Sequence, residues 1–179
     1  MSLPRITRAI ATIGVTILVG SALLVQRGVL VQAAPSQAVP RCSNIQLLIR
    51  PYGSNGAAGT IVITYRIHDL WNGVCSLYGY PGLELLDRNF QSLPTHLTRG
   101  GIIAGGIPVR YVQVSKGHDA YFALSYNDVT IDNFPCYSAP YLMITPPNDN
   151  LPVVTYSKIG APCAGRITVA PVMPTPQLG

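Results

Sequence analysis

Residues 59–68 read Gly-Thr-Ile-Val-Ile-Thr-Tyr-Arg-Ile-His, and this stretch decides the fold class. Every second residue from Ile61 to Ile67 is isoleucine or tyrosine, and these side chains would share one face of a strand. The opposite face would carry Thr64, Arg66 and His68. Because successive side chains of a strand point to opposite faces, the pattern predicts a β-strand with one buried face.

Shorter stretches of the same kind lie on both sides of this strand. They are rich in β-branched and aromatic residues, and glycine and proline punctuate the chain between them. The expected strands are residues 44–50, 59–68, 74–78, 83–87, 90–97, 109–115, 120–126, 141–145 and 166–172. The expected turns are residues 51–56, a type II turn at Pro81-Gly82, and residues 116–119, which would join two strands into a hairpin.

The short strands predict an all-β fold. After the N-terminal segment, no uninterrupted stretch of about 11 residues has the i, i+3, i+4, i+7 spacing of an amphipathic helix. We expect an antiparallel immunoglobulin-like sandwich of about seven to nine strands with two disulfides, preceded by a hydrophobic N-terminal signal helix. A small closed barrel is the alternative. The 17 glycines and 16 prolines of the 179-residue chain fit the many turns that either fold needs.

Residues 1–33 have the organisation of an export signal. Arg5 and Arg8 precede a long apolar run, residues 9–25, and a site of small residues ends at Ala33. Signal peptidase could therefore cleave after Ala33. The alternative is an uncleaved membrane anchor, but a helix of this run would reach only about 25 Å, short of the ~30 Å hydrocarbon core of a bilayer.

Cleavage there would leave a linker, residues 34–41, a β-sandwich domain, residues 42–173, and a disordered tail, residues 174–179. It would also remove three of the 12 basic residues, so that 9 would face 7 acidic residues and the net charge would fall from +5 to +2. No block of Lys and Arg remains that could neutralise a row of phosphates, which argues against nucleic acid as a partner. Membrane contact is expected only through an uncleaved N-terminal segment.

All four cysteines, Cys42, Cys75, Cys136 and Cys163, follow the predicted signal. An even number of cysteines in an exported chain is typical of a disulfide framework, and it predicts a secreted or cell-envelope location. Of the three possible pairings we favour Cys42 with Cys75 and Cys136 with Cys163, because sequential pairing gives each half of the domain one crosslink. A metal site is the alternative, but the cysteines lack the short spacing that metal ligands need.

Several motifs resemble a known family. They are Cys42-Ser43-x-x-Gln46-Leu47, residues 56–60, Cys75-Ser76-Leu77-Tyr78-Gly79-Tyr80-Pro81-Gly82, residues 116–121, Cys136, residues 141–147, Cys163 and residues 167–172. From about Pro40 to Met173 the chain is similar to DUF4232, a family of bacterial secreted domains of unknown function that is common in actinobacterial exported proteins and lipoproteins. The resemblance implies a secreted β-sandwich and no known activity. Residues 69–74 depart from the Asn- and Ser-rich turn that the family often has there, so no role of that turn is carried over.

The side chains that usually carry catalysis are not grouped in a recognised pattern. The three histidines, His68, His96 and His118, are far apart, and none forms an i, i+2 or i, i+4 pair. The chain has no Gly-x-Ser-x-Gly motif, and the predicted disulfides leave no free thiol nucleophile. We therefore expect no enzyme activity, no catalytic or metal-ligating residues and no cofactor.

Aromatic residues are the one feature that suggests binding. All 10 tyrosines and Trp71 follow the predicted signal. We hypothesise a ligand-binding site formed by Trp71, Tyr78 and Tyr80, because these residues flank the predicted Cys42–Cys75 disulfide and a tight turn. The alternative is that Tyr65, Tyr111 and Tyr126 pack in the core or at its edge and that the other aromatic residues are ordinary surface residues.

Together these observations predict an exported, non-catalytic domain that binds a cell-wall polymer or a surface protein. A purely structural envelope module without a ligand is the first alternative. A secreted hydrolase is the second.

Overall fold

The computed structural model describes residues 38–101, 103, 105–130 and 133–177, and within them the protein is all-β. One short 3₁₀ helix, η1 (Asn44–Gln46), precedes the strands. The strands are β1 (Leu47–Ala57), β2 (Thr60–Asp69), β3 (Val74–Tyr78), β4 (Gly82–Leu86), β5 (His96–Arg99), β6 (Tyr111–Ser115), β7 (Ala120–Asn127), β8 (Tyr141–Thr145), β9 (Val153–Tyr156) and β10 (Arg166–Val169). The all-β prediction is confirmed, with one strand more than the upper limit that we expected. The predicted signal peptide, residues 1–33, lies outside the described residues, within which no helix is long and apolar enough to cross a bilayer.

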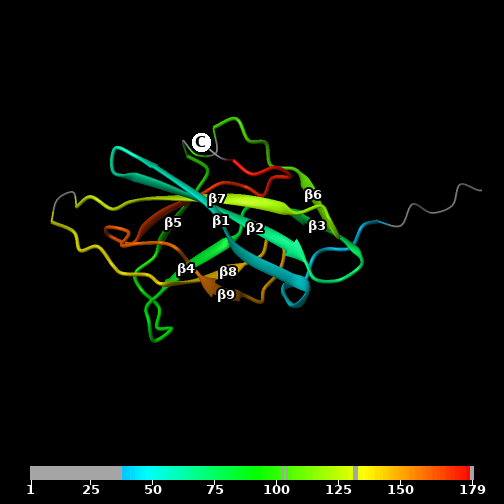
Figure 1. The fold of residues 1–179 in the computed structure, drawn as a ribbon, viewed down its shortest axis with the longest axis horizontal. Coiled ribbons are helices and arrows are strands. Elements are labelled where there is room, and N and C mark those ends of the chain that lie inside the picture. The colour runs from blue at the N-terminus through cyan, green and yellow to red at the C-terminus, as the bar shows by residue number, and fades with distance from the viewer. Residues whose placement is uncertain (1–37, 102, 104, 131–132, 178–179) are drawn as a thin grey trace, which may run out of the picture. The chain divides into compact units, whose positions relative to one another are not determined.

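The strands form three sheets (Figure 1). The largest has the order β1-β2-β7-β10-β5, the second has the order β4-β8-β9, and the third consists of β3 and β6. All neighbours are antiparallel except β10 and β5, which run parallel from the pairing of Arg166 with His96 onward. This pair corrects the expectation of a wholly antiparallel fold. Its cause is the path of residues 87–95, which carry the chain from β4 to the far edge of the largest sheet.

The strand predicted at residues 59–68 is β2, and it pairs with β1 along almost its whole length. β1 continues well beyond the turn that we expected at residues 51–56, because a bulge between Pro51 and Gly53 carries the strand past the proline. Proline is tolerated there since β1 is an edge strand. The chain instead reverses at Ala58 and Gly59, whose φ angles are +48° and +77°.

The other two predicted turns also differ from the structure. At residues 116–119, the backbones of Ser115 and His118 exchange two hydrogen bonds of 3.0 and 2.9 Å. β6 then pairs with β3 and β7 pairs with β2, so the predicted hairpin is wrong beyond its turn. Near Pro81 the positive φ belongs to Gly79 (+106°), and Gly82 already lies in β4, so the expected type II turn is not formed.

One hydrophobic core joins the three sheets. Ile63, Tyr65 and Ile67 of β2 are fully buried, as the alternation in the sequence predicts. Tyr65 stacks on Phe122 of β7, with ring centroids 5.0 Å apart, and its hydroxyl donates to the carbonyl oxygen of Ser157. The other sheets contribute Leu77, Leu85, Val114, Leu142 and Ile144. Burial of side chains of this size contributes roughly 1.5–3 kcal/mol each.

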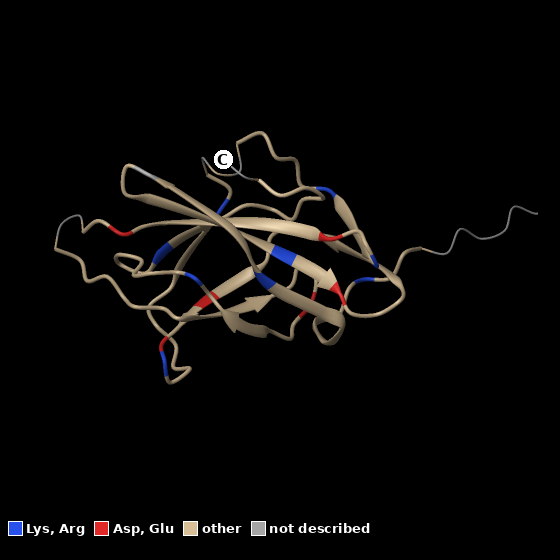
Figure 2. Ribbon diagram, viewed as in Figure 1, with Lys and Arg blue, Asp and Glu red and all other residues tan. Residues whose placement is uncertain are grey.

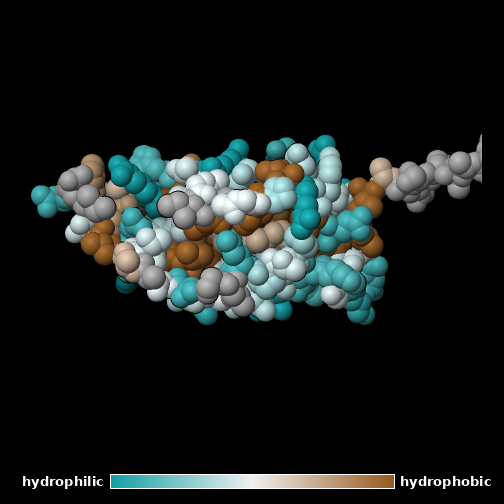
Figure 3. Space-filling view, turned by 90° about the horizontal axis from the view of Figure 1, so that it is seen from above, coloured by the Kyte–Doolittle hydropathy of each residue, from teal (hydrophilic) through white to brown (hydrophobic). Residues whose placement is uncertain are grey.

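The outer face of the largest sheet is partly covered by the C-terminal tail. A second, small hydrophobic cluster of Ala123, Ala170 and Met173 lies there, and hydrophobic residues on this side form small groups between hydrophilic ones (Figure 3). The Thr64 hydroxyl donates to the carbonyl oxygen of Gln177 at 2.6 Å, so this outward-facing threonine is buried. Residues 174–177 therefore follow the sheet, although we expected the tail at residues 174–179 to be disordered.

Candidate binding groove

The three aromatic residues that we expected to form one ligand site do not come together. Trp71 lies in the β2–β3 loop with 53% of its surface exposed, and its backbone N–H donates to Asp69 Oδ1 at 2.9 Å. Tyr78 is the last residue of β3, and it lies about 13 Å from Val74, the first residue of that strand, which follows the Trp71 loop. Tyr80 is partly buried against the core. The three side chains therefore occupy separate environments.

Tyr78 has an aromatic partner that the sequence did not indicate. It lies opposite Tyr111 in the β3–β6 register, and their ring centroids are 4.7 Å apart. Tyr111 is 72% exposed, although we expected it to pack in the core or at its edge. Tyr65 and Tyr126, for which we expected the same, are buried.

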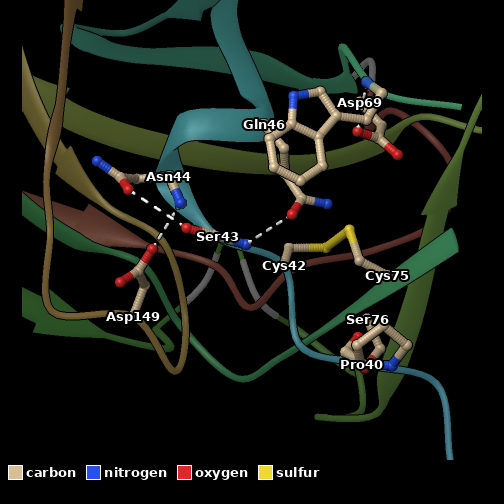
Figure 4. Close-up of a disulfide and its surroundings, with 10 residues drawn as sticks. Pro40, Cys42, Ser43, Asn44, Gln46, Asp69, Cys75, Ser76 and Asp149 are labelled. Atoms are coloured by element: carbon tan, nitrogen blue, oxygen red, sulfur yellow. Dashed lines mark hydrogen bonds between the residues drawn. A yellow bond between two sulfur atoms is a disulfide. The ribbon is translucent and has the colours of Figure 1, made fainter. Parts of the chain in front are cut away.

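The disulfide between Cys42 and Cys75 fixes the start of the domain to β3 (Figure 4). Ser76 N–H donates to the carbonyl oxygen of Pro40 at 2.8 Å, and Cys42 N–H donates to that of Ser76 at 3.1 Å. The last residues of the predicted linker therefore already pair with the domain.

Asp149 holds η1 against the loop between β8 and β9 (Figure 4). Its carboxylate accepts hydrogen bonds from the backbone N–H groups of Asn44 (2.6 Å), Asn150 (2.7 Å) and Leu151 (3.2 Å). Burial by itself would raise the pKa of this carboxyl group, but the three donors lower the pKa below its usual value. This end of the domain is thus held together by the Cys42–Cys75 disulfide and by the ionised carboxylate of Asp149.

A groove of about 600 Å³ lies beside the second disulfide, Cys136–Cys163, on the outer face of β7, β10 and β5. Both disulfides thus have the sequential pairing that we favoured. We call this surface the β5–β10 groove. Its floor is formed by His96, Thr98, Ser125, Arg166 and Thr168, and its wall by Phe134, Pro135 and Tyr137.

The floor is polar because alternate residues of the three strands point away from the core. Thr98 lies opposite Thr168, which in turn lies opposite Ser125, so three hydroxyl groups form a row across the sheet. His96 lies opposite Arg166 in the neighbouring row. The floor therefore offers hydroxyl groups, an imidazole and a guanidinium on a rigid sheet.

The wall is aromatic and is held in place by backbone hydrogen bonds. The Phe134 ring lies 5.5 Å from the guanidinium carbon of Arg166, within the range of a cation–π contact. Ala164 N–H donates to the carbonyl oxygen of Pro135 at 2.8 Å, and Cys163 N–H donates to that of Asn127 at 3.0 Å. The wall is therefore tied to the floor by covalent and hydrogen-bonded links.

Gly165 allows β5 to start beside β10. Its φ is +62°, and a Cβ atom at this position would lie 1.9 Å from the carbonyl oxygen of Pro94. His96 N–H donates to the carbonyl oxygen of Gly165 at 2.8 Å. The floor thus depends on a backbone contact that excludes any side chain at this position.

The charge of the groove is positive or neutral. Arg166 is a cation, and none of the described lining residues is a carboxylate. Within the described chain, no three His, Cys, Asp or Glu side chains gather as metal ligands. The arrangement can stack on flat ligand surfaces, hydrogen-bond hydroxyl groups and attract negative charge.

A family model described as Domain of unknown function (DUF4232) matches residues 42–173, which is more than half of the chain. The chain belongs to the DUF4232 family. Searches of curated proteins and of solved structures gave no match. Because the family carries no assigned activity, the function of this DUF4232 domain has to be argued from its groove.

The sequence contains only a partial signal for the groove of the DUF4232 domain. Residues 96–98 and 166–169 alternate polar and apolar side chains, which is typical of strands with one solvent-facing side. The parallel pairing that brings His96 beside Arg166 joins segments far apart in the chain, and no local pattern reveals it. Phe134 lies outside any predicted strand, so its contact with Arg166 could not be foreseen.

Proposed function

We propose that this DUF4232 domain is an exported, non-catalytic module that binds a polymer of the cell envelope in the β5–β10 groove. The single observation that carries the proposal is the groove itself, an aromatic wall beside a polar, acid-free floor. The two disulfides support an oxidising, extracellular environment. The signal-like residues 1–33 support export.

A glycan chain suits this surface better than a peptide does. Sugar rings have flat C–H faces that stack on aromatic rings such as Phe134 and Tyr137, and hydroxyl groups that exchange hydrogen bonds with Thr98 and Thr168. A groove open on the outer face of a sheet can also take one stretch of a long chain. Arg166 would favour a polymer that carries negative charge.

We further propose that the three sheets form an immunoglobulin-like sandwich. The shared core of the largest sheet with the β3–β6 and β4–β8–β9 sheets supports this arrangement. In such a scaffold the rigid sheet would position the floor, and Phe134, Pro135 and Tyr137 would form the wall.

The test is binding of the oxidised protein to purified cell-wall polysaccharide fractions. We expect Phe134→Ala and Arg166→Gln each to weaken binding roughly tenfold, because each removes one partner of the wall–floor contact. Trp71→Ala is the matched control, an exposed aromatic residue outside the groove, and should bind like the wild type.

Binding that is lost in Trp71→Ala and retained in Phe134→Ala would move the site to the β2–β3 loop. Absence of binding to every envelope fraction would leave the structural-module alternative. Equal melting temperatures of the variants would show that the differences arise from the site and not from folding.

A further inference from the structure

A second groove, of about 400 Å³, lies between two sheet edges. It is lined by Arg50 and Pro51 of β1 and by Thr155, Tyr156 and Lys158 at the end of β9. β1 is the edge of the largest sheet and β9 is the edge of the three-stranded sheet. We call this surface the β1–β9 groove. Its described lining contains two cations and no carboxylate.

Arg50 has no acidic partner within ion-pair distance among the described residues. The register places it directly opposite Arg66, and the basic positions on β1 and β2 lie side by side in Figure 2. Asp119 is 3.7 Å from Arg66 Nε and 2.7 Å from His68 Nδ1. Because this one carboxylate serves Arg66 and His68, the charge of Arg50 is not neutralised by it, and like charges directly opposite in a sheet are unfavourable.

Lys158 is held in an unusual backbone conformation. Its φ is +55°, in the left-handed region that Gly and Asn adopt more easily. Its neighbours Ser157 and Ile159 are both buried. Ser157 N–H donates to the carbonyl oxygen of Pro140 at 2.9 Å, and Ile159 N–H donates to Ser157 Oγ at 3.0 Å. The backbone that carries the Lys158 side chain is therefore fixed by hydrogen bonds on both sides. Backbone strain of this kind often occurs at functional sites.

We propose that the β1–β9 groove binds a phosphate group between the Arg50 guanidinium and the Lys158 ammonium. Thr155 also lines this groove, and a threonine hydroxyl can donate a further hydrogen bond. A guanidinium binds two oxygens of one phosphate in a fork, and an ammonium adds a point charge. Arg50 and Lys158 form no ion pair among the residues that the structure describes, and two such cations suit a phosphate, which carries up to two negative charges, better than a carboxylate. This site is independent of the β5–β10 groove.

The test is an NMR titration of backbone amide signals with inorganic phosphate. We expect saturable shifts at Thr155 and Lys158 that weaken when sodium chloride is raised, because salt screens exposed charges. Acetate at the same concentrations should give much smaller shifts. Acetate shifts as large as those with phosphate, or no saturable phosphate shift at all, would overturn the assignment.

Two variants separate the site from folding. Arg50→Gln and Lys158→Asn should each weaken phosphate binding about tenfold. Asn tolerates the left-handed conformation, so Lys158→Asn should not lower the melting temperature. Lys116→Gln, which removes an exposed cation in the β6–β7 turn, is the control and should bind like the wild type. Unchanged binding in both Arg50→Gln and Lys158→Asn would also overturn the site.

The same titration with two carriers identifies the source of the phosphate. Glycerol phosphate represents a soluble or polymeric phosphodiester, and vesicles containing phosphatidylglycerol represent a lipid headgroup. Binding of either, lost in Arg50→Gln, supports the site. Binding of neither, together with no response to inorganic phosphate, contradicts it.

Discussion

Among the described glycines, Gly165 is the one at which an added methyl group should destabilise the fold most. A Cβ atom there would overlap the carbonyl oxygen of Pro94, at 1.9 Å, in addition to the left-handed φ of +62°. We predict that Gly165→Ala lowers the free energy of unfolding by about 3 kcal/mol or more, because the backbones of β5 and β10 must separate. Urea denaturation measures the loss.

Gly117 is the matched control for this prediction. Its φ is +84°, but a Cβ atom there would meet nothing within 4 Å. Gly117→Ala should therefore show only the conformational penalty, roughly 1 kcal/mol. Equal losses in the two variants would contradict a special role for the contact between Gly165 and Pro94.

Because of Asp149, the free energy of unfolding should depend on pH in the acidic range. The pKa of its carboxyl group is lower in the folded protein than the value of ~3.9 in an unfolded chain. Its ionisation therefore stabilises the fold above that value, and the contribution is lost as pH falls through the folded pKa. Asp149→Asn should lower the free energy of unfolding by about 1 kcal/mol at pH 7, and the difference should shrink below about pH 4.

Urea denaturation at several pH values between 7 and 3 tests this dependence. Asp128→Asn is the control, because Asp128 is exposed and its side chain has no hydrogen bond or ion pair among the described residues. If the difference in unfolding free energy between wild type and Asp149→Asn stays constant over the whole pH range, the ionised Asp149 carboxylate does not stabilise the fold as predicted.

At the scale of elements, the two disulfides should have equal effects on stability and unequal effects on the groove. They close loops with sequence separations of 33 and 27 residues. Removing either one by paired Cys→Ser substitution should lower the free energy of unfolding by about 3–4 kcal/mol. Only removal of Cys136–Cys163 should release the wall and weaken polymer binding.

Denaturant unfolding and polymer binding of the two double variants measure these effects side by side. The Cys42→Ser, Cys75→Ser variant is the control, because its disulfide lies away from the groove. Equal weakening of binding in both variants would indicate general loss of the fold instead of a specific role of the second disulfide.

The strands show how far sequence patterns determine this fold. β2 was predictable because isoleucine and tyrosine alternate with polar residues along it and face the core. β9 was not predicted, although the run Val153-Val154-Thr155-Tyr156 has the β-branched and aromatic composition of a strand. The strand predicted at residues 90–97 begins only at His96, because the carboxylate of Asp87 fixes a turn by accepting from Asn89 and Gln91 N–H groups, both at 2.8 Å.

For the whole molecule, the proposed binding surface was harder to predict than the fold class. The all-β structure and the two disulfides could be predicted because composition, the number of cysteines and the alternation within each strand can be read from the sequence without knowing how distant segments pair. The β5–β10 groove combines residues from β5, β7, β10 and the segment before Cys136. Such a combination depends on sheet order, which local patterns do not contain. Tyr78 and Tyr80 illustrate this, because they are near neighbours in sequence and yet lie in different surroundings, Tyr78 against Tyr111 and Tyr80 against the core.

The parallel pair of β5 and β10 also determines when the groove can exist. The two strands are about 70 residues apart in the chain, and contacts over such distances form slowly because a long loop must first close. A chain is synthesised from its N-terminus, so β5 cannot pair with β10, His96 opposite Arg166, until the domain is almost complete. A nascent or truncated chain that ends before residue 166 therefore lacks Arg166 and Thr168 of the floor. The proposed binding surface can therefore form only once residues 166–169 are available to pair with β5.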